Sequence, residues 1–216
     1  MLWALAQPAA ALGLAGAFLL GLGMRVLAQR LVARRLGLAA AVPLRPHPRA
    51  DVDPVGAVAL LLGGTGWGRG AVVLSGRSGP RFFALAAGPV LVLAASQAAF
   101  AAFRWAYPGD LGALAVNRPS DVLRGVVAAS MAEQFILSVA VGLLCFALLA
   151  LVPVPPLDGY RLLRLAWGGR DPELPPVVDR LGVLALLLLL VVPVHGTTPL
   201  LAALDAVGTP LVRLWT

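Results

Sequence analysis

Residues 151–159 read LVPVPPLDG, and this stretch closes a long apolar run. The prolines within 152–156 must end that run as a helix, because proline lacks an amide donor and clashes with the preceding turn. Behind them stands Asp158, whose carboxylate can cap the free amides of a short helix over 159–167. An ionisable residue next to a membrane-length run is also a functional candidate. The stretch therefore marks both the end of one helix and a candidate site.

The composition is that of an integral membrane protein. Of the 216 residues, 60% are hydrophobic and 12% are charged, and the mean hydropathy is +0.90, whereas about a quarter of the residues in a soluble domain are charged. All 17 basic residues are arginine, and the net charge is +7. These arginines lie in the gaps between apolar runs, which favours anionic lipid rather than nucleic acid as a partner. The single cysteine, Cys145, excludes an intramolecular disulfide.

Run lengths and helix breakers predict an all-α polytopic membrane protein with one domain over 1–216. We expect helix 1 at 9–36, helix 2 at 81–103, helix 3 at 122–151, the PPLDG segment with a short helix at 152–167, helix 4 at 177–194, and an interfacial or re-entrant tail at 199–216. Apolar runs within 51–79 are too short to cross a membrane as helices, and glycines interrupt them. This segment should form a re-entrant loop or a β-hairpin, with its backbone satisfied by protein or water.

The distribution of arginines predicts the orientation. No arginine precedes Arg25, whereas the first loop carries seven, from Arg34 to Arg81, the second carries three and the third carries four. Because cytoplasmic loops are enriched in basic residues, the first and third loops should be cytoplasmic and the N-terminus should lie outside. We expect the location to be a bacterial cytoplasmic membrane.

Residues 25–29, RVLAQ, place two polar side chains inside the first apolar helix. Twenty-four uncharged residues precede Arg25, and Gln29 follows one turn later on the same helix face. The residues alone leave two explanations open. Arg25 either snorkels to the cytoplasmic interface, or it points inward to a polar partner.

Four segments, in the same order along the chain, resemble the site-2 protease family of intramembrane zinc metalloproteases. LVPVPPLDG is similar to the family's N-L-L-P-x-P-P-L-D-G, in which the aspartate is a zinc ligand, and AAGPVLVLA at 86–94 is similar to its A-G-P-x-x-N segment. Residues 47–72 look like its H-x-D-P-x-G and G-x-x-x-G-W-A-K-P region, and RLVARRLG at 30–37 resembles the residues after its H-E-x-x-H. The resemblance covers 22–165 and implies a core of three transmembrane helices with the 51–79 segment between the first two.

The same alignment implies that the catalytic positions are replaced. Arg25 stands where the family has its first zinc histidine, Val26 where it has the catalytic glutamate, and Gln29 where it has the second histidine; only Asp158 matches. A guanidinium offers no lone pair to a metal, a glutamine carbonyl is a poor zinc ligand, and valine cannot act as a general base. We therefore expect no catalytic residue at these positions, and neither zinc nor another cofactor.

In place of a metal site we expect an ion pair between Arg25 and Asp158, with Gln29 completing the hydrogen bonds. The two histidines, His47 and His195, are assigned to loops rather than to a metal. The remaining residues that the resemblance places in the cleft or its loop are Asp53, Pro54, Gly56, Trp67, Gly88, Pro89, Pro155, Pro156 and Gly159.

These expectations favour a catalytically inactive pseudo-protease that binds or regulates a transmembrane peptide or a partner membrane protein. Two alternatives remain open. One is an active intramembrane metalloprotease with an unorthodox site, acting in regulated intramembrane proteolysis. The other is a structural subunit of a larger membrane complex. The expected partners are membrane lipids and a membrane protein or transmembrane peptide, with no nucleic acid.

Overall fold

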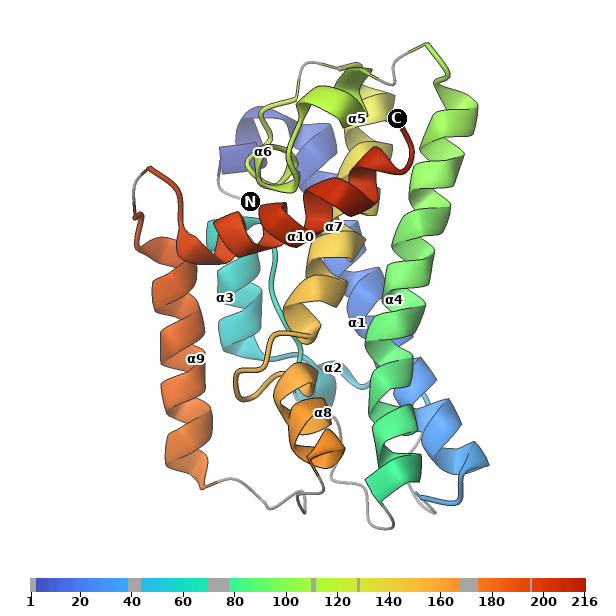
Figure 1. Cartoon of the computed structure of the whole chain (residues 1–216). Helices are drawn as coiled ribbons and strands as arrows, with labels where there is room; N and C mark the ends of the chain where they lie inside the picture. The colour runs from blue at the N-terminus through green and yellow to red at the C-terminus, as the bar shows by residue number, and fades with distance from the viewer. Residues whose placement is uncertain are drawn as a thin grey trace.

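The structure, a computed structural model, describes residues 3–38, 44–69, 78–109, 112–127, 129–167, 175–194 and 196–216. Within these ranges the chain is helical and contains no β-strand. Three helices are long and apolar enough to cross a membrane, namely α1 (Pro8–Arg35), α4 (Ser78–Ala106) and α7 (Met131–Ala150). Each of them packs against the other two, as Figure 1 shows. This confirms the prediction of an all-helical chain with apolar helices of membrane length.

The ends of these helices follow from local chemistry. Pro8 opens α1, where its fixed φ suits the first helical turn and its missing amide costs nothing. A capping box opens α7, because the Ser130 hydroxyl accepts from the Glu133 amide and the Glu133 carboxylate accepts from the Ser130 amide. Glu133 is therefore a structural residue of the helix start, as an acidic residue near a helix N-terminus should be.

The predicted third helix, 122–151, is two helices. The short α6 (Pro119–Leu123) precedes α7, and Gly125, at φ 69°, separates them in a left-handed conformation that only glycine adopts readily. Arg124 stands next to this glycine, and apolar residues lie on both sides of the two, so run length alone does not separate the helices.

The predicted fourth span is shorter than a membrane crossing. In the structure α9 (Pro176–Val191) has 16 residues, or about 24 Å at a rise of about 1.5 Å per residue, and it is not among the three candidate spans. The tail forms α10 (Pro199–Arg213), which crosses the upper part of the bundle in Figure 1 rather than running along it. This direction agrees with an interfacial helix.

The segment predicted as a re-entrant loop or hairpin contains α2 (Pro48–Asp51) and α3 (Pro54–Gly63). The hairpin alternative is wrong over 54–63, because Asp53 caps the Val55 amide and Pro54 stands at the first helical position, so a helix starts there despite its glycines. One antiparallel bridge, between Val52 and Gly68, closes the segment. Residues 70–77 lie outside the described part of the chain.

The remaining elements are short. They are η1 (Trp3–Ala6), α5 (Gly112–Val116) and α8 (Asp158–Ala166). The helix α8 packs mainly against α4. This packing brings Asp158, the first residue of α8, close to both α4 and α1. Figure 1 shows α8 at the lower end of the bundle, beside α4 and near α2.

Candidate functional site

Arg25 and Asp158 form a bidentate ion pair inside the helix bundle. The Nε of Arg25 lies 2.6 Å from Oδ2 of Asp158, and its Nη2 lies 2.6 Å from Oδ1. The arginine is 3% exposed and the aspartate 0%. A snorkelling arginine would expose its guanidinium, so that explanation is wrong for Arg25. The side chain points inward, to the residue with which the sequence pairs it.

The pair lies deep along the first span. At a rise of about 1.5 Å per residue, Arg25 stands about 26 Å along α1 from Pro8, and the helix continues to Arg35. An isolated charge at that position is costly, and pairing with an opposite charge offsets much of the cost. The contact also ties α1 to the first residue of α8, which follows the third span.

Gln29 completes the coordination of the aspartate. Its Nε2 donates to Oδ2 of Asp158 at 2.9 Å and to the carbonyl oxygen of Leu85 at 3.1 Å. That carbonyl is available because Pro89, four residues later in α4, has no amide to donate to it. The proline that interrupts the hydrogen bonds of α4 therefore supplies an acceptor that orients Gln29.

Gly88 allows α4 to approach the pair. A Cβ at this position would lie 2.8 Å from Cγ of Arg25 and 2.9 Å from Nε2 of Gln29, both too close for a normal contact. Gly88 and Pro89 thus have separate roles, one leaving space for the two side chains and the other freeing a carbonyl. The resemblance predicts both residues for the cleft, and in the structure both lie at the polar centre formed by Arg25 and Gln29.

The loop residues of the site also meet one another. Asp53 accepts from the indole Nε1 of Trp67 at 2.8 Å as well as from the Val55 amide at 3.0 Å. A Cβ on Gly56 would collide with the carbonyl of Trp67, so the first turn of α3 can lie against the Trp67 backbone only with glycine there. Beyond this contact, Nη1 of Arg25 donates to the carbonyl of Arg69 at 3.0 Å and joins the loop to the ion pair.

A second buried ion pair lies next to the first and was not predicted. Nη2 of Arg30 donates to Oδ1 of Asp51, whose Oδ2 accepts from the His47 amide at 2.6 Å. Arg30 also donates to the carbonyl of Arg45. The arginine and the aspartate are 21 positions apart, so no helical spacing rule connects them, and only the fold of the loop could reveal the pair.

The predicted capping role of Asp158 is wrong. Leu157 is the N-cap of α8, and Asp158 is its first helical residue, with both carboxylate oxygens engaged by Arg25 or Gln29. Gly159 follows because a Cβ there would collide with the carbonyl of Leu151 at the end of α7. The carboxylate of Asp158 is therefore engaged in the ion pair and does not cap α8.

Other candidate residues play parts in packing. Val26 is buried in an apolar cluster that includes Phe18 and Phe146, so it offers no base beside the pair. Pro155 joins Pro156 through a cis peptide bond, and its carbonyl lies where a Cβ on Gly182 of α9 would be. His47 is exposed in its loop.

His195 lies outside the described residues. Cys145 is fully buried in α7.

The residues present do not fit a zinc site. Asp158 is the one residue that matches a zinc ligand in the resemblance, and Arg25 and Gln29 donate three hydrogen bonds to its two oxygens. The guanidinium itself occupies the position from which a cation would contact the carboxylate. The cavity bounded by Arg25, Trp67 and Asp158 measures about 10 Å³, which is the volume of about one water probe. Among the described residues, no group of three or more His, Cys, Asp or Glu is placed to hold a metal.

The chain matches no protein-family model, no curated protein and no solved structure.

Proposed function

We propose that this chain is an integral membrane protein with a site-2-protease-like core that does not cleave peptides and instead acts as a binding, regulatory or assembly subunit for a transmembrane partner. The observation that carries this proposal is the bidentate contact between Arg25 and Asp158, two residues that the resemblance aligns with zinc ligands of the family. A fixed guanidinium there supplies positive charge to the aspartate without an open coordination position for water.

The missing base supports the same conclusion. Metal-dependent peptide hydrolysis needs a group that takes a proton from water. Val26, which the resemblance aligns with the family's glutamate, is apolar and packed in the core. The carboxylate of Asp158 accepts hydrogen bonds from Arg25 and Gln29 on both of its oxygens.

A structural subunit of a larger membrane complex is the second candidate function, and the small cavity favours it. A space of about 10 Å³ beside Asp158 has no room for an extended peptide. A partner would then bind on the outside of the bundle rather than at the ion pair. The two candidates differ in whether a peptide enters a cleft next to Arg25.

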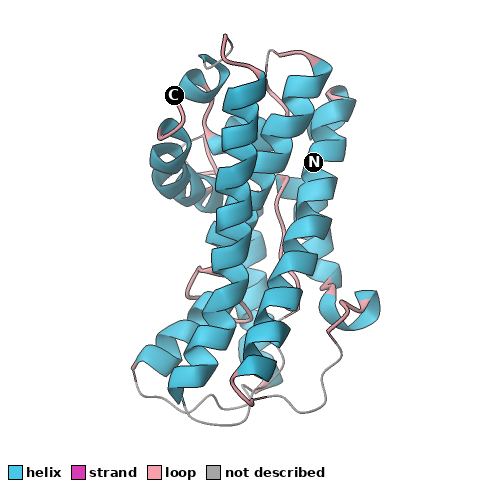
Figure 2. Cartoon of the chain, turned by 90° about the vertical axis from the view of Figure 1, so that its right-hand side faces the viewer, coloured by secondary structure: helices cyan, strands magenta, loops and turns pink. Residues whose placement is uncertain are grey.

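The surface of α4 supports a partner outside the bundle. Only 33% of the most apolar 18-residue stretch of α4 is buried inside the protein, compared with 56% of the corresponding stretch of α1 and 67% of that of α7. Its exposed apolar residues include Phe83 and Val90, which lie two turns apart on one helix face. Because α4 stands at the right of Figure 1, it faces the viewer in Figure 2. We propose this face of α4 as the side that meets a transmembrane partner.

The proposed orientation follows the arginines. The N-terminus would lie outside, and the first and third loops would lie in the cytoplasm of a bacterial cell. The Arg25 and Asp158 pair would then be close to the cytoplasmic side of the membrane. Cysteine labelling from each side of a cysteine-free variant (Cys145→Ala), with single cysteines placed at Gly37 and Gly109, tests this orientation.

Bound zinc distinguishes the proposal from an active metalloprotease. We expect the purified protein to contain far less than one zinc per chain, whereas a variant with the family's residues restored (Arg25→His, Val26→Glu, Gln29→His) should gain zinc if the core has the proposed fold. Stoichiometric zinc in the unmodified protein would contradict the proposal. Failure of a well-folded restored variant to bind zinc would contradict the likeness to the family.

Photo-crosslinking tests the partner. A crosslinking residue placed at Val90, on the exposed face of α4, should give a discrete protein adduct in native membranes. The same residue at Leu12, exposed on α1, serves as the matched lipid-facing control. Lipid adducts alone at both positions would argue against a partner on α4.

A further inference from the structure

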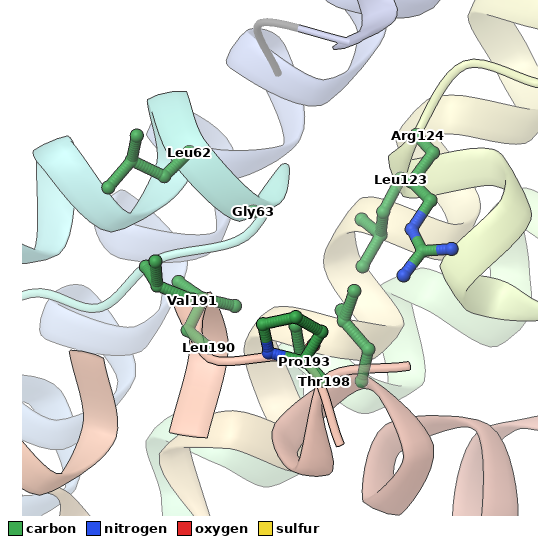
Figure 3. A pocket seen from close by; sticks show the side chains of 9 residues that line it. Leu62, Gly63, Leu123, Arg124, Leu190, Val191, Pro193 and Thr198 are labelled. Carbon is green, nitrogen blue, oxygen red and sulfur yellow. The ribbon is translucent and has the colours of Figure 1, made fainter. Parts of the chain in front are cut away.

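A second cavity lies away from the ion pair, where the ends of α3, α6 and α9 meet the start of α10, as Figure 3 shows. Its volume is about 390 Å³, within the range of roughly 300–1,000 Å³ that small-molecule sites occupy. The walls are mainly apolar and include Leu62, Leu190 and Leu201. A cavity of this size and lining suits a hydrocarbon chain.

Two polar side chains line the same cavity. Thr198 is only 9% exposed, and its hydroxyl has no hydrogen-bond partner among the described residues. It is the N-cap residue of α10, a position at which a threonine hydroxyl normally accepts from the helix, yet it makes no such bond. A buried hydroxyl without a partner costs free energy, so the position favours a ligand that supplies one.

Arg124 provides positive charge at the cavity. Figure 3 shows its guanidinium extending from the end of α6 toward the space above Pro193 and Thr198. In the part of the chain that the structure describes, no ion pair involves this side chain. The carboxylate of Asp205, on the neighbouring helix, accepts from the amide and hydroxyl of Ser120 instead. The guanidinium is therefore available to an anion.

The start of α10 adds to this positive field. This helix of 15 residues begins at Pro199, and its N-terminal amides carry the positive end of the helix dipole. Anions bind readily at such a position when another group fixes them there. Thr198 and Leu201 belong to the first turn and line the cavity, so the positive end of α10 and the guanidinium of Arg124 lie at one site.

The cavity lies at the C-terminal ends of two helices, α3 and α9. Gly63 and Val191, at the C-terminal ends of α3 and α9, are both part of its lining. In Figure 1 these ends lie at the level of α10, toward the end of the bundle that holds α5 and α6. The exposed leucines of α9 continue from the cavity along the bundle. A headgroup at α10 would thus leave its acyl chain directed along α9, parallel to the spans.

From these contacts we infer that the cavity is a binding site for one anionic phospholipid. One acyl chain enters the apolar part between Leu62, Leu190 and Leu201, the phosphate contacts the guanidinium of Arg124, and the Thr198 hydroxyl donates to a phosphate or ester oxygen. This inference rests on the membrane location within the proposed function. It does not depend on the absence of protease activity or on the family resemblance.

Lipid binding to the full chain in a non-ionic detergent, measured by native mass spectrometry and by thermal unfolding, tests the site. Dioleoylphosphatidylglycerol should bind in preference to dioleoylphosphatidylcholine and raise the unfolding temperature. Inorganic phosphate should give no comparable shift, because it cannot use the apolar walls. Arg124→Gln should weaken phosphatidylglycerol binding by roughly tenfold, as expected for a lost charge-assisted hydrogen bond.

Two further variants examine the other contacts. Thr198→Val keeps the shape of the side chain and removes its hydroxyl, so it should weaken phosphatidylglycerol binding by roughly threefold or more. Leu62→Trp should fill part of the cavity and reduce binding of both lipids. If Arg124→Gln failed to fold, these two variants would decide the question alone.

Arg213→Gln is the matched control, because Arg213 is exposed in the last turn of α10, outside the cavity lining. It should bind phosphatidylglycerol as the unmodified chain does. The inference is overturned if the two lipids bind equally, if phosphate alone reproduces the shift, or if Arg213→Gln loses as much binding as Arg124→Gln. Zinc content has no bearing on any of these outcomes, so this test and the test of the protease-like core can fail separately.

Discussion

Pro89 leaves the carbonyl oxygen of Leu85 without a donor from its own helix, and that oxygen is bound by another helix instead. The donor is Nε2 of Gln29, which also contacts Asp158. A helix interruption within a span normally has to be satisfied by neighbouring side chains or water. Here the interruption in α4 serves to hold a side chain of α1 against the buried carboxylate.

Replacing Gln29 tests this contact. Gln29→Leu should lower the free energy of unfolding by about 1–3 kcal/mol, because Asp158 loses a donor and the Leu85 carbonyl is left unpaired. In a Pro89→Ala background the restored amide at position 89 can satisfy that carbonyl, so the loss should be smaller. Unfolding in mixed micelles measures both values, and an equal loss in the two backgrounds would contradict the role given to Pro89.

Gly88 should be intolerant of even one methyl group. Gly88→Ala places a Cβ about 2.8 Å from Arg25 Cγ, and we expect it to lower the free energy of unfolding by about 1–3 kcal/mol through overpacking. Gly23→Ala on α1 is the control, since a Cβ there meets nothing within 4 Å. That control should be neutral or slightly stabilising, because alanine favours a helix over glycine. Similar losses at both glycines would point to a general effect of glycine in these helices.

The indole of Trp67 should stabilise the loop through its hydrogen bond. Trp67→Phe removes the donor to Asp53 and should cost about 1–3 kcal/mol, because the indole is buried and the carboxylate loses a partner. Trp105→Phe is the matched control, as Trp105 is 87% exposed and should change stability by less than about 0.5 kcal/mol. A neutral result at Trp67, measured by the same unfolding assay, would contradict the account of the loop.

The sequence predicts the existence of the long helices better than it predicts where helices begin and end. Composition and run length predict the three apolar helices, because hydrophobicity over about twenty residues depends on local sequence only. They do not locate the break at Gly125, because run length alone passes over one charged residue, Arg124, and the glycine after it. They also overestimate α9, where an apolar run continues to Val194 although the helix ends at Val191.

The Arg25 and Asp158 pair could be predicted from the sequence, because each charge had to find a partner once it was buried. Arg25 follows twenty-four uncharged residues, and Asp158 was the acid that the order of the four segments placed opposite it. The pair of Arg30 and Asp51 was not predictable, because it depends on how the loop folds back across α1. The lipid cavity gave no sequence signal either, since its lining combines α3 and α6 with the consecutive helices α9 and α10, which lie far from them along the chain.

The central claim is that Arg25 and Asp158 act as one buried unit, and a double-mutant cycle on unfolding in mixed micelles tests it most directly. Arg25→Ala alone leaves a buried carboxylate without its cation and should cost about 3–5 kcal/mol. Arg25→Ala with Asp158→Ala should cost clearly less than that single change, because no uncompensated charge remains. Losses that are equal in the single and double variants, or that simply add, would contradict the pairing.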